Sequence, residues 1–315
     1  MYHRIAQDAQ DPWNLCVSPA NFAEQMDVVR RRRRPMRLAE LTAQLKQGRC
    51  PRGAVVVTFD DGYRDNLLAA LPVLEAFDVP ATIFCTAGFI GRDESFWWDG
   101  LASLLLRPDC LPPTLALDVG GHRMHKTLGN AAGYSSAQRA ADRGKEHDND
   151  ASPRLCFYRE VWAWLRPLAE SDRARALKAV ADWSVGAGGQ LANAPAALSR
   201  EQVSRLAASA LIEIGAHSVT HAALPALPPP QQRDEIGRSK AQLEELVGRP
   251  VLHFAYPFGD QSPETAALVR EAGFDSSCTT ASGAVRARTD LFHLPRIGIG
   301  DWDGDRFAKS LRNVL

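Results

Sequence analysis

Two adjacent carboxylates, Asp60 and Asp61, follow the apolar run 54–57 and precede Gly62. This run of β-forming residues before an Asp-Asp-Gly turn predicts a buried strand that ends in two acids. Open α/β sheets and α/β barrels build their active sites at the carboxyl ends of such strands. A cation could hold one acid ionised while its neighbour stays available for proton transfer. Taken alone, the same residues also fit an ordinary surface turn.

A pair of histidines, His217 and His221, follows a second apolar segment at 211–215. Positions i and i+4 face the same way on a helical turn, so two imidazoles at this spacing can share one ion. A His-x-x-x-His pair alone is as compatible with chance as with a metal site. Combined with a carboxylate from another strand end, it predicts a catalytic metal with positions open to water and substrate.

The stretches that must position these residues alternate between strand and helix patterns. Strands are predicted at 54–59 and 81–85, with a helix at 65–77 between them, which makes a parallel unit. The alternation resumes after Ser199 and Gln202, which form a capping box. We expect further strands at 211–215, 253–256, 276–279 and 294–299, and helices at 231–247 and 263–272.

Residues from about 92 to 200 interrupt this alternation with helical patterns, among them 101–106, 158–168 and 173–183. We interpret them as a helical insertion that shapes or covers the cleft, not as an independent domain. Within the insertion, residues 129–154 are rich in small and charged residues and predict a surface loop.

The composition is that of a soluble globular protein. Of 315 residues, 45% are hydrophobic, and Lys+Arg balance Asp+Glu at 37 each, so the charge gives no indication of nucleic-acid binding. No apolar run approaches the roughly 18–20 residues that span a bilayer, and the N-terminus lacks a hydrophobic signal core. Six cysteines without a Cys-x-x-Cys pair favour reduced thiols. We therefore expect a cytoplasmic protein, unless the natural chain starts upstream of Tyr2.

Five consecutive arginines occupy positions 30–34 and are followed by Pro35. Such a run can mark an anion or nucleic-acid patch. Here it ends a helix that Ser18 and Pro19 begin, and the helix dipole favours cations at that end. We interpret the run as a solvated helix end.

Three motifs together resemble the polysaccharide deacetylase family, with its NodB-homology fold of carbohydrate esterase family 4. They are Thr-Phe-Asp-Asp-Gly at 58–62, His-Ser-Val-Thr-His at 217–221 and Phe-Ala-Tyr-Pro-Phe-Gly at 254–259. The resemblance covers roughly 54–92 and 205–300. It implies an α/β fold, a distorted (β/α)7 barrel, in which residues 1–315 form one catalytic domain with the helical insertion at about 92–200.

The resemblance also implies a metal-dependent hydrolase that removes N-acetyl groups from an amino sugar or glycan. Asp61, His217 and His221 would bind a divalent metal, and zinc suits two imidazoles and one carboxylate. Asp60 would be the base that deprotonates the metal-bound water. Tyr256 and Phe258 would be the substrate and oxyanion residues, with a backbone N–H near Phe258 stabilising the tetrahedral oxyanion.

Two positions depart from the pattern of many family members. Ala255 stands where an Arg would orient the base, and Phe258 stands where a Tyr would follow the Pro. The second change is tolerable if only the backbone N–H acts. For the first, Arg296 in the segment 294–297 is the best replacement, and an Arg exposed at a strand end is the alternative.

The general acid has two candidates, His3 and His293. Many family members take it from a C-terminal Leu-x-His segment, near which His293 lies. The chain also resembles the circularly permuted branch that includes the poly-N-acetylglucosamine deacetylases, which begins with a Tyr-His strand like Tyr2-His3. In that branch the N-terminal His protonates the leaving amine, and imidazole suits this task near pH 7. We favour His3.

The expected partner is an N-acetylated sugar, oligosaccharide or sugar conjugate, with no nucleic acid and no membrane span. An amidohydrolase acting on a small non-sugar amide is an alternative. A sugar-binding module that has lost catalysis is another, although binding alone needs no base such as Asp60 beside an ion.

Overall fold

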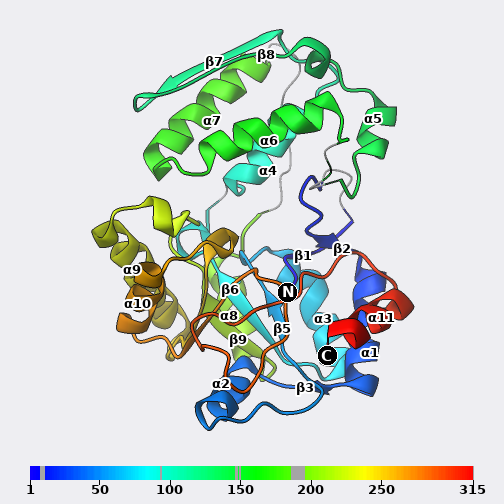
Figure 1. Ribbon diagram of the computed structural model, residues 1–315, viewed down its shortest axis with the longest axis vertical. Coiled ribbons are helices and arrows are strands. Elements are labelled where there is room, and N and C mark those ends of the chain that lie inside the picture. The colour runs from blue at the N-terminus through cyan, green and yellow to red at the C-terminus, as the bar shows by residue number, and fades with distance from the viewer. Residues whose placement is uncertain (8–10, 93, 146–147, 149, 186–195, 315) are drawn as a thin grey trace. The chain divides into compact units, whose positions relative to one another are not determined.

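The structure is a computed structural model that describes residues 1–315 except 8–10, 93, 146–147, 149, 186–195 and 315. The chain divides into two compact units (Figure 1). The first comprises Met1–Gln7, Leu15–Arg92 and Ala197–Leu315, and the second comprises Asp8–Asn14 and Asp93–Ala196.

A five-stranded parallel sheet forms the centre of the first unit, in the order β11-β10-β9-β6-β5. Helices cover both faces of a parallel sheet, so its strands are buried and consist mostly of apolar or small residues. The strands are β5 (Val57–Phe59), β6 (Ala81–Cys85), β9 (Ile212–Ala216), β10 (His253–Ala255) and β11 (Ser276–Cys278).

Two further extended segments continue this sheet at its edges. Tyr2 forms a parallel bridge with Phe59 of β5, and Leu294 forms one with Cys278 of β11. The two added segments also join each other, because the Met1 amino group donates to the Ile297 carbonyl (2.8 Å) and the Ile299 N–H donates to the Met1 carbonyl (3.1 Å). Seven extended segments therefore close a distorted barrel, and the predicted (β/α)7 fold is confirmed.

Helices surround the barrel (Figure 1), with α1, α3 and α11 on one side and α9 and α10 on the other. Two short parallel sheets accompany them, β1 (Arg4–Ile5) with β2 (Cys16–Val17) and β3 (Arg34–Pro35) with β4 (Ala54–Val55). The helices are α1 (Pro19–Arg32), α2 (Leu38–Lys46), α3 (Leu71–Phe77, preceded by a π-helical turn Asn66–Ala70), α8 (Arg200–Ala208), α9 (Pro229–Val247), α10 (Pro263–Glu271) and α11 (Gly304–Val314).

Most of these helices were predicted from the sequence, but α11 was not. Phe307, Ala308 and Leu311 form the buried face of this helix, and α11 packs against α1. None of the described helices combines the length and the hydropathy that crossing a bilayer requires.

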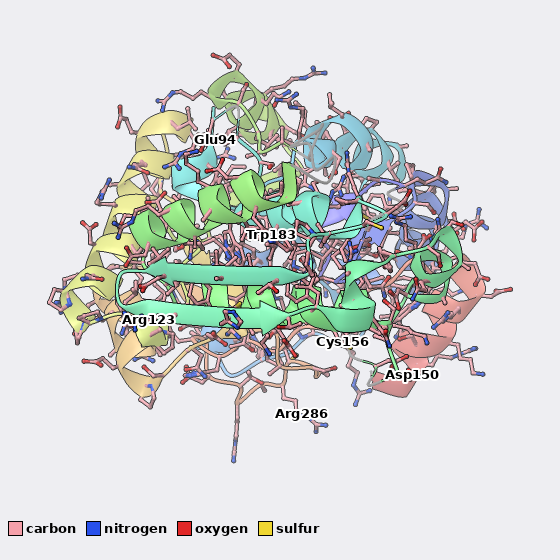
Figure 2. All side chains as sticks on the ribbon, turned by 90° about the horizontal axis from the view of Figure 1, so that it is seen from above. Glu94, Arg123, Asp150, Cys156, Trp183 and Arg286 are labelled. Carbon is pink, nitrogen blue, oxygen red and sulfur yellow. The ribbon has the colours of Figure 1, made fainter. Side chains whose placement is uncertain are left out.

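The described part of the second unit contains the helices expected of a helical insertion and also an antiparallel hairpin that was not predicted. Strands β7 (Thr114–Val119) and β8 (His122–Thr127) pair through a Gly120-Gly121 turn with positive φ at both residues. Two-residue turns of this kind match the twist of paired strands. Alternate residues of β7 are buried, and Trp183 of α7 donates to the Thr114 carbonyl (2.7 Å). Figure 2 shows α7 lying along the hairpin.

The remaining elements of this unit are helices α4 (Trp97–Leu106), α5 (Ser136–Ala141), α6 (Pro153–Leu165) and α7 (Glu170–Val185), with a 3-10 turn at Gly129–Ala132. The predicted loop at 129–154 is thus partly helical. Buried Arg154 explains part of this order, since its guanidinium donates to the carbonyls of Leu105, Pro108, Ala131 and Ala132.

Candidate active site

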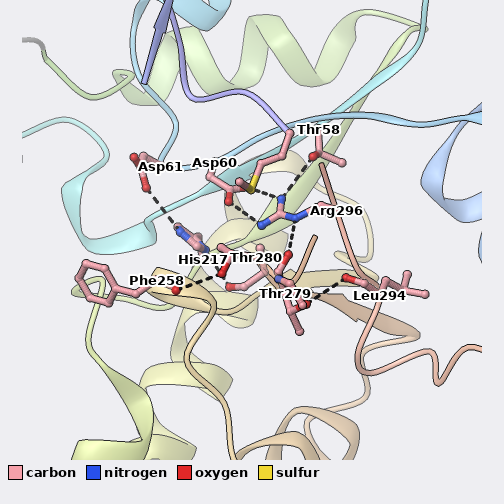
Figure 3. A network of polar contacts seen from close by, with 12 residues as sticks. Thr58, Asp60, Asp61, His217, Phe258, Thr279, Thr280, Leu294 and Arg296 are labelled. Carbon is pink, nitrogen blue, oxygen red and sulfur yellow. Dashed lines mark hydrogen bonds and ion pairs between the residues drawn. The ribbon is translucent and has the colours of Figure 1, made fainter. Parts of the chain in front are cut away.

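Asp60 and Asp61 lie at the carboxyl end of β5, as the sequence analysis predicted. The Asp60 N–H donates to the Tyr2 carbonyl (3.0 Å), which continues the pairing of β5 with the N-terminal segment. Asp61 leaves the strand with φ 72°, a left-handed conformation that Asp tolerates better than most residues. Figure 3 shows the result, in which the Asp60 side chain meets Arg296 and the Asp61 side chain meets His217.

The Asp61 carboxylate contacts both histidines of the downstream motif. Its Oδ1 lies 3.4 Å from His217 Nε2 and 3.3 Å from His221 Nε2, and all three side chains are buried. Their candidate ligand atoms lie within 4.8 Å of one another. The structure therefore brings together the three residues that the sequence analysis proposed as metal ligands.

The distance of the Asp61 carboxylate from each imidazole fits a shared metal ion. Ligand atoms that share a tetrahedral zinc ion at about 2.0–2.1 Å must lie about 3.3–3.4 Å apart, which is the distance from Asp61 to each imidazole. His217 Nδ1 also lies 2.7 Å from the Ala255 carbonyl oxygen. Because only an Nδ1–H can donate there, this contact leaves the Nε2 lone pair directed at the cluster, a common arrangement of metal-binding histidines.

The loop that carries the two histidines is held by Glu235 of α9. The Glu235 carboxylate accepts hydrogen bonds from the N–H groups of Val219 and Thr220 and from the Thr220 hydroxyl, each at 2.9 Å. The loop needs this support because Ser218 and His221 both have positive φ, 59° and 54°. Sequence reasoning missed Glu235, since an acid on an amphipathic helix carries no local sign of a distant loop.

Burial alone would raise the pKa of Asp61, but hydrogen bonds to His217 and His221 outweigh it and hold that pKa below its usual range. Burial likewise would lower the pKa of His217, but the hydrogen bond to Asp61 outweighs it and leaves the pKa raised. The cluster thus concentrates negative charge where two imidazoles converge, which suits a cation.

Asp60 forms a separate ion pair with Arg296. Its two carboxylate oxygens each lie 2.6 Å from one terminal guanidinium nitrogen, and both side chains are buried. Arg296 Nε donates to the Thr279 carbonyl (2.9 Å) and Nη1 donates to the Thr58 hydroxyl (3.3 Å). Burial would raise the pKa of Asp60, but the Arg296 charge outweighs it and the pKa lies below its usual range. The expected contact of Arg296 is present, and its catalytic role stays a prediction.

His3 is close enough to the two carboxylates for their charges to act on its imidazole. Burial lowers its pKa, and the charges of Asp61 and Asp60 act against that shift, so the imidazole is within electrostatic reach of both. The neighbouring backbone is fixed, because Asn66 Nδ2 donates to the His3 carbonyl (2.8 Å). His293 is engaged elsewhere, with its ring nitrogens 3.1 Å from Asp290 and 2.9 Å from Gln261.

The two candidate substrate residues differ in their surroundings. Phe258 lies beside the cluster, with its ring centroid 4.4 Å from that of His221 and with φ 60°. Tyr256 does not fit the expected role. Its ring is fully buried, its hydroxyl donates to the Phe292 carbonyl (3.1 Å) and its N–H donates to the Cys278 carbonyl (3.1 Å). Both donors of Tyr256 are therefore used inside the barrel.

Comparison with known proteins identifies the family of this chain. A model of the polysaccharide deacetylase family matches residues 47–109 and 171–277, more than half of the chain. The chain belongs to the polysaccharide deacetylase family. The Bacillus subtilis (strain 168) polysaccharide deacetylase homologue YxkH is 28% identical over 118 residues, which cover 37% of this chain and 42% of that protein. The chain thus matches less than half the length of this relative.

Solved structures share the fold. The Streptococcus pyogenes deacetylase PplD, solved in complex with acetate, has a TM-score of 0.60 at 17% identity, covering 98% of this chain and 95% of that chain. IcaB from Ammonifex degensii has a TM-score of 0.58 at 19% identity, covering 98% and 93%. The Bacillus cereus polysaccharide deacetylase BC0361 has a TM-score of 0.59 at 18% identity, covering 99% and 67%. At these identities the comparison establishes the fold.

Proposed function

We propose that this protein is a metal-dependent hydrolase that removes the N-acetyl group from an amino sugar or a glycan. The proposal rests mainly on one observation, that the two adjacent acids have different partners. Asp61 is held by His217 and His221, and Asp60 is held by Arg296. A protein that only binds sugar could use the cluster of Asp61 with the two histidines, but it would gain nothing from the ion pair of Asp60 with Arg296. Membership of the polysaccharide deacetylase family supports this substrate class.

Asp61, His217 and His221 would hold the metal, and their spacing and chemistry favour zinc among the divalent ions. When bound, such an ion supplies a Lewis acid that polarises the amide carbonyl and makes water more acidic. The carbonyl of Ala255 keeps His217 in the tautomer that binds metals through Nε2.

Asp60 is the proposed base. Its low pKa keeps it ionised at neutral pH, so it can accept the proton that the attacking water loses. Arg296 holds the carboxylate in place through two hydrogen bonds, which restricts its position during proton transfer. This role matches the one that many family members give to the Arg replaced here by Ala255.

His3 is the proposed acid, and a backbone N–H at Phe258 is the proposed donor to the oxyanion. Water adds to the acetyl carbon, and its proton goes to Asp60. The C–N bond then breaks, and the nitrogen takes a proton from His3, which must first be protonated. The products are acetate and a free amine. Acetate is also the ligand in the structure of PplD, which shares the fold.

Product analysis tests the function directly. The purified protein, reconstituted with Zn²⁺, is incubated with N-acetylated monosaccharides, nucleotide sugars and oligosaccharides, and released acetate is measured. We expect acetate from at least one of these classes, and none from the Asp60→Asn variant, which keeps its metal by elemental analysis. Wild-type turnover in that variant would rule out Asp60 as the base. Acetate released only from small non-sugar amides would favour the alternative amidohydrolase.

A further inference from the structure

A large cavity in the first unit lies apart from the candidate active site. Its volume is about 810 Å³, within the range of ligand pockets. Its walls come from the N-terminal segment, residues 50–58, the loop 283–287, the segment 294–299 and three helices. None of Asp60, Asp61, His217 and His221 lines it, although Thr58 and Arg296 form part of its wall. A ligand here would not occupy the position of the reacting amide.

The inner wall of the cavity is apolar. It includes side chains from strands and helices alike: Leu38, Leu41, Val57, Leu294, Phe307 and Leu311. These side chains are buried, so they contribute to the packing of the barrel and its helices as well as to the cavity. Such a wall accommodates a hydrocarbon chain and offers little to a polar sugar.

The lining of the cavity is basic. Arg33, Arg52 and Arg286 line it, Arg52 and Arg286 are exposed, and no Asp or Glu occurs among its described lining residues. Within the part of the chain that the structure describes, none of these three guanidinium groups has an ion-pair partner. Arg296, the fourth arginine of the wall, is already neutralised by Asp60. Three positive charges therefore line the cavity without a counter-charge among its described lining residues.

The run 30–34 gains a second explanation from this arrangement. Arg30 pairs with Asp78 (3.4 Å) and Arg31 pairs with Asp27 (2.8 Å), as a solvated helix end would. Arg33 follows the last residue of α1 and lines the cavity instead. The interpretation of the run as a helix end thus covers its first residues and leaves Arg33 with a different environment.

We propose that this cavity binds an amphiphilic anion, a single hydrocarbon chain that ends in a carboxylate or a phosphate. The chain would lie against the apolar wall, and the head group would meet Arg33, Arg52 and Arg286. Guanidinium groups are well suited to carboxylate and phosphate oxygens, which they can bind through two parallel hydrogen bonds. The proposal concerns a site distinct from the deacetylase centre and does not depend on the proposed activity.

Calorimetry with decanoate and decyl phosphate, each below its micelle-forming concentration, tests the proposal. We expect both to bind the wild-type protein, and decanol and decyltrimethylammonium to bind at least tenfold more weakly. Inorganic phosphate should also bind weakly, because it lacks the chain. A triple variant with Arg33→Gln, Arg52→Gln and Arg286→Gln should lose at least tenfold in affinity for the anions. Ala284→Phe places a ring at the cavity lining and should also weaken the binding of both anions.

A matched control removes the same charge elsewhere, with Arg143→Gln, Arg200→Gln and Arg205→Gln, three exposed arginines outside the cavity lining. This variant should bind decanoate like the wild type. Equal binding of decanol and decanoate, or unchanged affinity in the cavity triple variant, would overturn the proposal. It would also be overturned if only vesicles of anionic lipid bind in an arginine-dependent manner, because the three arginines would then form a membrane-contact surface.

Discussion

The carboxylate of Asp60 and the guanidinium of Arg296 form a buried two-point ion pair across 236 residues of sequence, with both hydrogen bonds at 2.6 Å. The segment that carries Arg296 also pairs with the N-terminal segment through Met1. Asp60 accepts no other side-chain hydrogen bond among those described, whereas its neighbour Asp61 faces two imidazoles. The two adjacent acids therefore have different environments, because their partners lie on different segments of the barrel.

Replacing Arg296 with Gln should destabilise the protein by about 3–5 kcal/mol, because it leaves the Asp60 charge buried without its partner. Urea unfolding of the metal-bound protein measures this change. Arg296→Lys should recover part of the stability, since the charge remains, but less of the turnover, since an ammonium group cannot bind both oxygens. If the Lys variant turned over substrate as fast as the wild type, the two-point contact would not be needed for catalysis.

Glu235 should act as a positioning residue for the metal ligands. Glu235→Ala removes three hydrogen bonds from the histidine loop and should weaken zinc binding about 10- to 100-fold, the usual effect of losing a partner outside the ligand set. Glu235→Gln keeps an oxygen for the backbone N–H groups and should retain most of the affinity. Chelator competition measures both, and the exposed neighbour Asp234, replaced by Ala, is the matched control. Equal affinity of the Ala variant and the wild type would contradict this role.

His3 and His293 can be separated by parallel substitution. His3→Ala should lower kcat about 10²- to 10⁴-fold, the range expected for loss of a general acid. His293→Ala should leave kcat nearly unchanged, because its ring contacts Asp290 and Gln261 instead of the reacting groups. Zinc content should stay stoichiometric in both. The opposite result, with only the His293 variant impaired, would exclude His3 as the acid.

Zinc affinity should fall as the pH falls. His217 must be neutral to bind a metal, and Asp61 raises its pKa in the metal-free protein, so protons compete with the metal from that raised pKa downward. Removal of zinc by a chelator should also lower the melting temperature, since a ligand at 1,000 times its Kd contributes about 4 kcal/mol. Chelator titrations and melting curves across a pH series measure both effects. A pH-independent zinc affinity would argue against imidazole ligands.

His253 should make folding stability depend on pH independently of the metal. Burial lowers its pKa to about 4, against about 6.5 in the unfolded chain. The unfolded state therefore binds the proton first, and stability falls as the pH drops from about 6.5 to about 4, by about 3 kcal/mol in total. His253→Gln should flatten this part of the curve relative to the wild type in urea unfolding. Parallel curves for the two proteins would contradict the expectation.

Local sequence was sufficient for most of the barrel elements, because burial on both faces imposes apolar runs and helices require periodic apolar faces. It was insufficient in the second unit, where the predicted loop at 129–154 is partly helical, and at the C-terminal helix. The hairpin of β7 and β8 was missed despite alternating residues and the Gly120-Gly121 turn, since the surrounding helical patterns dominated the interpretation. Helix α11 was missed because its apolar face is short and is explained only by its packing against α1.

The sequence by itself determined the family and the set of groups available for chemistry, since Asp60, Asp61, His217 and His221 stand in motifs whose residue types and order are specific. It also indicated Arg296 and His3 as candidates, but only as alternatives to an exposed strand end and to His293. The tertiary structure decided that Arg296 reaches Asp60, that Glu235 supports the histidine loop and that Tyr256 faces the core. These are contacts between residues far apart in the chain, and barrel closure, not local propensity, sets which of them meet.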